Sequence, residues 1–205
     1  MEYVDIFDEN NNSLNYCVSR EEAHDKKLWH RHVSCWIMNE KGQVLMQQRA
    51  LTKKKNPGMW AKTGGHVESG ETPDEAISRE VYEEIGLKVD KKDIKNIEIF
   101  KSNNSNENYF SYGYIFFTRY KENDFILQKE EVNSVKYYSI EQLEQFRQSN
   151  DPNFTFNKWN DEGFLKQINL LKTYRDKIIK KIDDILKGEI MDDIVESLKE
   201  PILEL

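Results

Sequence analysis

The chain is poor in cysteine and lacks long apolar runs, which argues against a disulfide-rich protein and against a membrane-spanning one. Only two cysteines, Cys17 and Cys35, occur in 205 residues, so no disulfide framework is expected. No apolar run approaches the roughly 18 residues that a membrane helix requires. The first residues, Met1 to Asp5, show neither the basic stretch nor the apolar core of a signal peptide. We therefore expect a cytoplasmic protein without a transmembrane segment.

An excess of basic residues is also missing. Lysine and arginine number 30 against 37 acidic residues, which gives a net charge of −7. An acidic protein is a poor candidate for nonspecific nucleic-acid binding, so no nucleic-acid polymer is expected as a partner. Hydrophobic residues make up 38% of the chain, enough for a globular core. The length suits one such core with additions, and no internal repeat is visible.

One segment carries most of the functional information. Between Gly65 and Leu87 the chain reads G-H-V-E-S-G-E-T-P-D-E-A-I-S-R-E-V-Y-E-E-I-G-L. It sets seven residues at fixed offsets: Gly65, Glu71, Arg79, Glu80, Glu83, Glu84 and Gly86. With two further aliphatic positions, this arrangement arises by chance on the order of once per billion windows.

The middle of this segment predicts a helix. Thr72 is a helix N-cap, Pro73 suits the first helical position, and Glu75 completes a capping box. Gly86 is placed to end the helix in a left-handed conformation. An apolar stripe at helical spacing should face the core and consists of Ile77, Val81 and Ile85.

Three carboxylates share one side of this helix. Glu80, Glu83 and Glu84 fall within an arc of roughly 100°, where like charges repel. The spacing indicates that no lysine or arginine neutralises the arc, because Arg79 points elsewhere. Oxygen ligands of this kind select Mg²⁺ or Mn²⁺, and Mg²⁺ shares its coordination shell with substrate phosphates. A solvated acidic helix face is the alternative, but the other fixed residues of the segment favour a metal site.

The segment resembles the Nudix box, G-x5-E-x7-R-E-U-x-E-E-x-G-U with U aliphatic, at every position. The resemblance implies an α/β/α sandwich in which the carbonyl of Gly65 and the side chains of Glu80, Glu83 and Glu84 hold one to three Mg²⁺. It also implies that Arg79 orients the glutamates and that Glu71 supports the loop.

The reaction implied by this resemblance is hydrolysis. Water attacks a phosphorus atom of a diphosphate linked to a group X, which makes Arg79, Glu80, Glu83 and Glu84 the expected catalytic residues. A bound metal lowers the pKa of water and neutralises charge on the transferring phosphoryl group. The expected partner is a small molecule that contains a diphosphate, with X in the form of a nucleoside derivative.

Three parts are expected along the chain. Residues 1–27 form a β-hairpin extension followed by a short helix, residues 28–150 form the α/β domain with a mixed sheet, and residues 151–205 form a helical extension. The expected strands of the domain are 32–38, 44–48, 97–101, 109–120 and 135–138, with helices at 72–86 and 139–147. The extension contains an amphipathic helix from Gly163 to Lys187 and a shorter apolar stripe from Ile190 to Leu198. Packing on the core, a homodimer interface and a substrate lid are alternatives for this tail.

Substrate selection is expected outside the motif. Aromatic residues that would stack on a base, or would instead pack in the core, are Trp60, Tyr112, Tyr114 and Phe154. Basic residues that would meet distal phosphates, or would form an ordinary exposed loop, are Arg49 and Lys53 to Lys55. Candidates for an extra carboxylate near the attacking water are Glu107, Glu130 and Glu131.

Parts of the chain also resemble isopentenyl-diphosphate isomerase, a Nudix-fold enzyme. The similar segments are 30–36, 47–51 and 56–60, and the isomerase's metal histidines have counterparts at His24, His30 and His66. The isomerase requires a catalytic cysteine directly before a Gly-His pair, where this chain has Gly64, and Cys35 lies on another strand. We keep His66 as a candidate beside the metal loop and discount His24.

Three hypotheses follow for the function. The first is a Nudix pyrophosphohydrolase, the second is an isomerase, and the third is a non-catalytic Nudix-fold binding module. The intact glutamates argue against the third, and Gly64 argues against the second. The arrangement of residues 1–150 resembles a bacterial, isomerase-like Nudix subgroup, but that resemblance does not identify the substrate.

Overall fold

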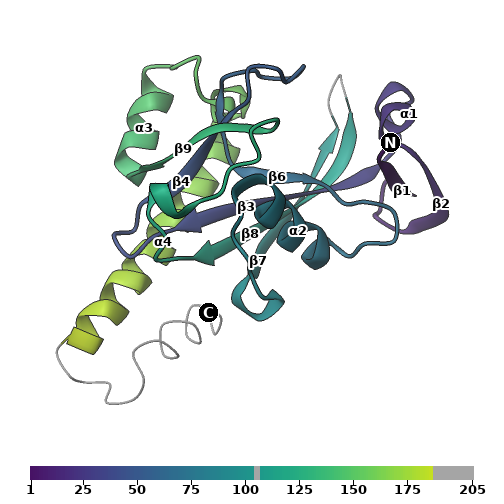
Figure 1. The fold of residues 1–205 in the computed structure, drawn as a ribbon. Helices are drawn as coiled ribbons and strands as arrows, with labels where there is room; N and C mark the ends of the chain where they lie inside the picture. Colours follow the sequence, from purple (N-terminus) through teal and green to yellow (C-terminus); the bar gives the residue numbers. More distant parts are fainter. Residues whose placement is uncertain (104–106, 187–205) are drawn as a thin grey trace.

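A mixed β-sheet lies between two layers of helices, with a small N-terminal unit attached at one end (Figure 1). The computed structural model describes residues 1–103 and 107–186. The strands are β1 (Tyr3–Phe7), β2 (Ser13–Ser19), β3 (His30–Met38), β4 (Val44–Arg49), β5 (Trp60–Ala61), β6 (Thr63–His66), β7 (Lys95–Asn103), β8 (Asn108–Phe117) and β9 (Val132–Tyr138). The helices are α1 (Arg20–Asp25), α2 (Pro73–Ile85), α3 (Ile140–Gln148) and α4 (Asp161–Leu186), with short 3₁₀ turns at Lys91–Asp93, Glu122–Asp124 and Thr155–Lys158.

Alternation along β3 explains the two helical layers. Cys35 and Ile37 face α2, in a core that contains Ile77, Val81 and Ile85. Trp36 and Met38 point to the opposite face and pack in a second core with α3 and α4. Because side chains of a strand alternate between the faces of its sheet, this one strand contributes to both cores. The α/β/α architecture predicted from the motif is confirmed.

The strand β3 pairs with two different strands along one of its edges. Its whole length pairs in parallel with β8, from His30 with Tyr109 to Met38 with Phe117. On its other edge, residues 32–35 pair with β6, whereas only Ile37 and Met38 pair with β4. The strand β4 pairs further with β5 and β9, which gives a seven-stranded mixed sheet.

The predicted helix ends are confirmed. At the start of α2, the hydroxyl of Thr72 accepts a hydrogen bond from the backbone amide of Glu75, and the Glu75 carboxylate accepts one from the amide of Thr72. Gly86 ends α2 with a φ of 71°, a left-handed conformation that favours glycine. The caps therefore place the three glutamates of α2 in a fixed register above β6.

The N-terminal unit comprises the β1–β2 hairpin and α1, as predicted. Its own core is very small and consists of Val4, Ile6 and Ala23, with Val18 and Leu28 packed against it. Hydrogen bonds join it to the domain: the Phe7 amide donates to the carbonyl oxygen of Trp29, and the Ser69 amide donates to that of Tyr3. The N-terminal unit is therefore held in place mainly by its contacts with the domain.

The C-terminal helix packs on the core, which confirms one of the alternatives for the tail. The buried side chains of its apolar stripe are Phe164, Ile168, Leu171, Tyr174 and Ile178. The predicted stripe from Ile190 to Leu198 lies outside the described residues. Within the residues that are described, no helix is long and apolar enough to cross a membrane.

Candidate functional site

The three glutamates of α2 differ in their exposure. Glu84 is only 5% exposed, and its Oε2 accepts hydrogen bonds from Gln47 Nε2 at 2.9 Å and from the Gly64 amide at 3.1 Å. The side chain of Glu80 is 15% exposed and lies against Gly65. The side chain of Glu83 is 49% exposed at the mouth of the site. The arc thus extends from the sheet out to solvent.

Arg79 lies at the centre of these acids, which corrects the expectation that it points away from them. Its Nη1 donates to Glu80 Oε1 at 3.0 Å and to Glu83 Oε2 at 3.1 Å. Its Nε and Nη2 form a bidentate pair with Glu71, at 2.8 and 3.0 Å. Nη2 also donates to the carbonyl oxygen of His66 at 3.0 Å. Its pair with Glu83 has the i,i+4 spacing that favours an ion pair on a helix, whereas its contacts with Glu71 and the His66 carbonyl lie off the helix.

Burial leaves two carboxyl groups of the arc poorly ionised without a cation. Desolvation raises the pKa of Glu84 to about 8, and the charge of Glu80 raises it further. Desolvation also raises the pKa of Glu80 to about 7, against the lowering effect of Arg79. Two buried acids that resist ionisation mark a place where a divalent cation would be favourable.

Two glycines let β6 approach its neighbours closely. At Gly65, a Cβ atom would collide with the carboxylate of Glu80, so glycine lets that side chain lie against the strand. At Gly64, where φ is 152°, a Cβ atom would collide with the carbonyl oxygen of Val33 and would lie 2.7 Å from Cα of Ser34. Both positions therefore depend on the absence of a side chain.

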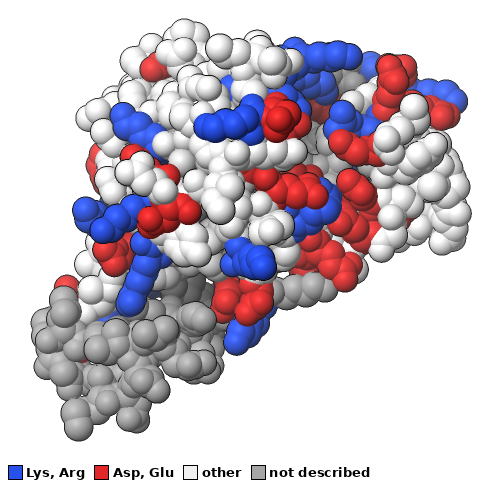
Figure 2. Space-filling view, viewed as in Figure 1, with Lys and Arg blue, Asp and Glu red and all other residues white. Residues whose placement is uncertain are grey.

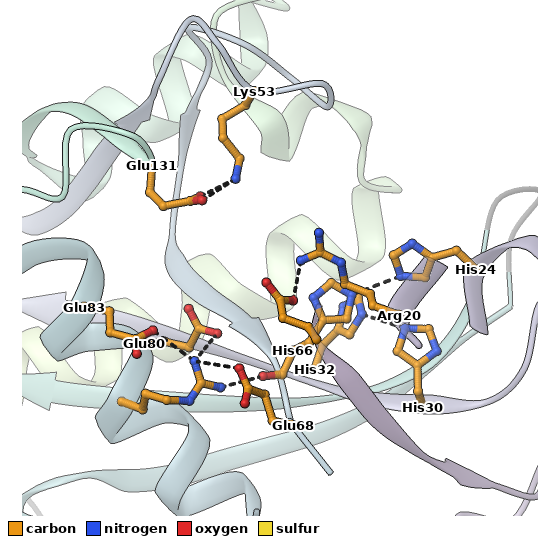
Figure 3. A network of polar contacts seen from close by, with 12 residues as sticks. Arg20, His24, His30, His32, Lys53, His66, Glu68, Glu80, Glu83 and Glu131 are labelled. Carbon is orange, nitrogen blue, oxygen red and sulfur yellow. Dashed lines mark hydrogen bonds and ion pairs between the residues drawn. The ribbon is translucent and has the colours of Figure 1, made fainter. Parts of the chain in front are cut away.

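The acids form the floor of a cleft of about 240 Å³ that has a partly basic rim. Figure 2 shows acidic side chains gathered where α2 faces the N-terminal unit, with basic side chains nearby. The lining residues are Glu2, Arg20, Arg49, Lys53, Gly64, Gly65, His66, Glu68, Arg79, Glu80, Glu83, Glu84, Gln128 and Glu131. Across the cleft, Lys53 Nζ lies 2.5 Å from the carboxylate of Glu131 (Figure 3). Such a cleft suits a molecule that carries several phosphates.

A second cluster of possible metal ligands lies next to the acids, beside the N-terminal unit, and shares His66 with the lining of the cleft (Figure 3). It consists of His24, His30, His32, His66 and Glu107, whose ligand atoms all lie within 4.8 Å of one another. Burial lowers the pKa of all four histidines. The imidazoles are therefore neutral near pH 7, which is the form that binds a metal.

The predicted substrate aromatics do not line the cleft. Tyr114 and Phe154 are buried in the two cores, and Trp60 packs beside Phe154 with its ring centroid 6.5 Å away. The hydroxyl of Tyr112 accepts a hydrogen bond from Asn11 in the N-terminal unit. Base stacking on these residues would thus require a place other than the cleft.

The predicted charged residues are divided among three places. Arg49 and Lys53 line the cleft, together with Glu131. Glu107 belongs to the histidine cluster, and its Oε1 lies 3.6 Å from Lys55 Nζ. Glu130 is exposed and is not part of either site.

Several site residues were missed in the sequence. Arg20 and Glu2 reach the cleft from the N-terminal unit, and Gln47 bonds to Glu84 from β4. His32 completes the histidine cluster, and the discounted His24 also belongs to it. Only the X-His-X-His alternation at 30 and 32 was a usable signal, because alternate residues lie on the same face of a strand.

Cys35 is not positioned to replace the isomerase's cysteine. It is 1% exposed in the core beneath α2, and burial raises the pKa of its thiol to about 12. Its Sγ donates to the carbonyl oxygen of Trp36 at 3.5 Å. A thiol in these surroundings is inert as an acid or a nucleophile near neutral pH.

Comparison with known proteins agrees with this geometry. A model of the NUDIX domain matches residues 28–159. An uncharacterized Nudix hydrolase of Clostridium acetobutylicum is 29% identical over 153 residues, which cover 71% of this chain and 73% of that protein. Nudix hydrolase 3 of Arabidopsis thaliana is 31% identical over 161 residues, 74% of this chain but 21% of that protein. An isopentenyl-diphosphate Delta-isomerase of Corynebacterium diphtheriae is 46% identical over 63 residues, 30% of this chain and 34% of that enzyme.

Solved structures show the same fold. A protein of Deinococcus radiodurans superimposes with a TM-score of 0.59 at 21% identity, over 72% of this chain and 90% of the other. A Nudix-family hydrolase of Clostridium perfringens superimposes with a TM-score of 0.50 at 22% identity, over 70% and 96%. Because the family model covers more than half of the chain, this protein belongs to the Nudix family.

Proposed function

We propose that this Nudix protein is a Mg²⁺- or Mn²⁺-dependent pyrophosphohydrolase that cleaves the diphosphate linkage of a nucleoside diphosphate derivative by attack of water on phosphorus. The observation that carries the proposal is the buried Glu84 and the partly buried Glu80, beside Gly65 in a cleft with a basic rim. Family membership supports an enzyme acting on pyrophosphate bonds.

The donor set fits a hard divalent cation. Glu80, Glu83 and Glu84 would hold it, with the backbone carbonyl of Gly65, and carboxylate and carbonyl oxygens are the ligands that Mg²⁺ prefers. Once bound, the cation would supply charge neutralisation for the phosphoryl group and a lowered pKa for water. Arg79 holds Glu80 and Glu83 through one nitrogen, so it fixes the spacing of two of these ligands.

The rim of the cleft would position the substrate. Arg20, Arg49 and Lys53 lie around the acids from three separate elements, and cationic side chains bind phosphate oxygens through charge-assisted hydrogen bonds. Glu131, which faces the floor of the cleft, is the extra carboxylate best placed to accept a proton from the attacking water. The ion pair with Lys53 would hold its carboxylate in a fixed position.

Hydrolysis of a substrate panel tests this function. Purified protein with Mg²⁺ or Mn²⁺ would be incubated with nucleoside di- and triphosphates, ADP-ribose and dinucleoside polyphosphates, and the products identified by chromatography. We expect metal-dependent hydrolysis of at least one diphosphate linkage, and none by a Glu84→Gln variant. Hydrolysis at the same rate without a divalent cation would contradict the proposal, as would no hydrolysis of the whole panel.

Isomerisation is the second candidate, favoured by the 46% identity over 63 residues and by the histidine cluster. Gly64 stands where that enzyme requires its cysteine, and Cys35 is buried elsewhere, so the proton exchange with carbon has no acid here. Incubation with isopentenyl diphosphate in deuterated water should give no label in the carbon skeleton and no dimethylallyl diphosphate. Enzyme-dependent formation of either would establish the isomerase instead.

A further inference from the structure

Lys62 is a cation whose protein partners are aromatic rings. Its Nζ lies 4.9 Å from the ring centroid of Trp36 and 5.1 Å from that of Trp159, close enough for cation–π contacts with both. An ammonium group also offers three hydrogen-bond donors, and none of these meets an acceptor among the described residues. Lys62 and Trp159 both keep part of their surface exposed. The donors of Lys62 are therefore available to a ligand.

The side chain of Lys62 lies on the face of the sheet opposite α2. The next residue, Thr63, faces α2, where its hydroxyl lies 3.5 Å from the side chain of Gln47. Neighbouring side chains of an extended segment point to opposite faces, so Lys62 points the other way. Its contact with Trp36, which packs in the core with α3 and α4, agrees with this direction.

A row of small residues connects Lys62 with the cleft. Gly64, which lines the cleft, lies beside Ser34 of β3, and Ser34 lies beside Gly113 of β8. The hydroxyl of Ser34 is buried and has no hydrogen-bond partner within the described part of the chain. At about 3.3 Å per residue, Lys62 lies roughly 10 Å along the strand from Gly65. That separation suits the base of a nucleotide whose diphosphate lies beside Gly65.

Glu98 already offsets the charge of Lys62. Its side chain is 7% exposed, accepts a hydrogen bond from Gln167 and pairs with Lys166 Nζ at 3.1 Å. Burial lowers the pKa of Lys62 to about 8, and the nearby Glu98 opposes this shift, so the amine stays protonated at pH 7. The carboxylate of Glu98 would repel a second anion but not a neutral acceptor. The surroundings of Lys62 therefore favour a neutral oxygen acceptor, such as a keto oxygen, over a phosphate or a carboxylate.

Trp159 offers an aromatic surface beside this amine. Its ring lies 6.5 Å from that of Trp36, at an angle of 78°, and it remains partly exposed. The preceding residue, Lys158, donates a hydrogen bond to Asn56, in the same loop as the cleft residue Lys53. Every base has a π face, so stacking on an aromatic ring tolerates all bases and cannot by itself select one. Selection would depend on a hydrogen bond.

We propose that Lys62 is a specificity-determining residue of the hydrolysis proposed above, on which this inference rests. Its ammonium donates a hydrogen bond to a keto oxygen of the substrate's base, which stacks on Trp159. The enzyme therefore prefers bases that present a keto oxygen at this place, such as hypoxanthine or uracil, to those that present an amino group, such as adenine or cytosine. An ammonium group donates but cannot accept, so an amino group would leave the donors on both sides unpaired.

Matched pairs of nucleotides test this preference. The di- and triphosphates of inosine and adenosine differ in a keto or an amino group on the base, and so do those of uridine and cytidine. We expect kcat/KM to be at least about tenfold higher for the keto member of one pair or both, the difference that a hydrogen bond to a charged group supplies. The rates are measured with the purified full chain at saturating Mg²⁺.

Three variants identify the group responsible. Lys62→Met keeps an unbranched chain between the two indoles but removes the donors, so it should lower kcat/KM for the keto member about tenfold and for the amino member less than about twofold. Lys62→Arg keeps a charged donor and should retain most of the preference. Lys180→Met, at an exposed position of α4, is the matched control. Thermal unfolding of each variant checks that the fold is intact.

Binding without turnover separates this inference from the hydrolysis. The monophosphates of the same four nucleosides would be titrated, and binding followed by the quenching of tryptophan fluorescence that stacking on Trp159 should cause. We expect the wild type to bind the keto member of a pair more tightly, and Lys62→Met to bind both members alike. If no diphosphate is hydrolysed, the proposed function fails, but this comparison still decides the role of Lys62.

Each outcome against the proposal is distinct. Equal kcat/KM and equal affinity within both pairs would overturn the base preference. A preference retained in Lys62→Met would assign it to another residue. An equal loss for the keto and amino members in that variant would show that Lys62 supports the fold of the strand and does not select the base. Binding without any tryptophan quenching would overturn stacking on Trp159.

Discussion

Two groups of possible metal ligands flank strand β6, and they differ in almost every chemical respect. The carboxylate arc of α2 offers only oxygen, lines a cleft and has Arg79 bonded within it. The histidine cluster offers four imidazoles and one carboxylate, and Lys55 Nζ lies 3.6 Å from the Glu107 carboxylate. Gly65 contacts the first group and His66 belongs to the second.

The two groups differ in the cations that their donor atoms suit. Hard oxygen ligands favour Mg²⁺, whereas imidazoles favour transition metals such as Zn²⁺. His66 lines the cleft and also belongs to the histidine cluster, so the two groups are neighbours. The four predictions that follow test the carboxylate side.

The largest effect is expected from neutralising the arc. Glu84→Gln and Glu83→Gln should each lower kcat by at least about a hundredfold, because each removes a charge that holds the metal of the reaction. Circular dichroism should show an intact fold. Glu130→Gln, at an exposed position outside both sites, is the matched control. Near-normal turnover of either variant at saturating Mg²⁺ would remove that residue from the site.

A smaller loss should follow from Arg79→Lys. Lysine keeps the charge but not the planar fork that binds Glu71 through two nitrogens and reaches Glu80 and Glu83 through a third. We expect kcat to fall roughly tenfold, the loss typical of disturbing groups that orient metal ligands. Steady-state kinetics at several Mg²⁺ concentrations measure this. An unchanged kcat with unchanged metal dependence would contradict the orienting role of Arg79.

Arg20→Ala should affect substrate binding and leave the chemistry nearly intact. Arg20 lines the cleft but pairs with Glu2 at a position where both side chains are 44% exposed, so the pair can be exchanged for a phosphate at little cost. We expect KM to rise several-fold, about 1 kcal/mol of binding, with kcat nearly unchanged. Lys26→Ala, which removes an exposed pair at the far end of α1, is the control. An equal rise in KM in both variants would show that the effect is not specific to the cleft.

The smallest effect is on stability. At ten times its dissociation constant, Mg²⁺ should stabilise the fold by about 1.4 kcal/mol, a rise in Tm of roughly 3–6 °C. The folded-state pKa values of Glu80 and Glu84, about 7 and about 8, lie above the ordinary value of 4.5. Their contribution to the stability of the metal-free protein is therefore complete below about pH 4.5 and is lost as pH rises through 7 and 8.

The effect of the metal should have the opposite pH dependence. Mg²⁺ binds the ionised carboxylates, so the increase in Tm that it causes should widen between about pH 6 and about pH 8.5. Differential scanning fluorimetry across this range, with and without Mg²⁺, gives the measurement. In Glu84→Gln, the Tm increase caused by Mg²⁺ should change much less with pH. An increase in Tm that is the same at every pH would contradict metal binding to these two acids.

Local signals in the sequence were sufficient for the fold and for the carboxylate arc. The capping box at Thr72, the left-handed Gly86 and the apolar stripe of α2 depend on neighbours within a few residues, and all appear in the structure. The guanidinium of Arg79 was misplaced because its position depends largely on Glu71 in the preceding loop and on the carbonyl oxygen of His66 at the end of β6. Helical spacing indicates its i,i+4 pair with Glu83 but not these two contacts.

The histidine cluster illustrates the same limit more strongly. His24 and Glu107 lie far apart in the chain and meet only because the fold brings α1 beside the residue that precedes β8. The predicted substrate aromatics were also ambiguous, because an aromatic residue beside a cleft and one in a core have the same local pattern. The hydroxyl of Tyr114 donates a hydrogen bond to Asp74, 40 residues earlier in the chain, which holds the ring in the core. A pattern of neighbouring residues contains no information about such a distant contact.

The close packing around Gly64 limits which side chains this position can accept. The isomerase's cysteine would have to be introduced at this position, but any side chain there meets the backbone of Val33 and Ser34 on the neighbouring strand. Backbone atoms cannot move aside as the end of a flexible side chain can, so Gly64→Cys would first have to displace β3. Because β3 contributes side chains to both cores and carries two of the histidines, a displacement of this strand would disturb the packing of both cores. A Gly64→Cys substitution alone would therefore disturb the sheet before the new thiol could act as an acid.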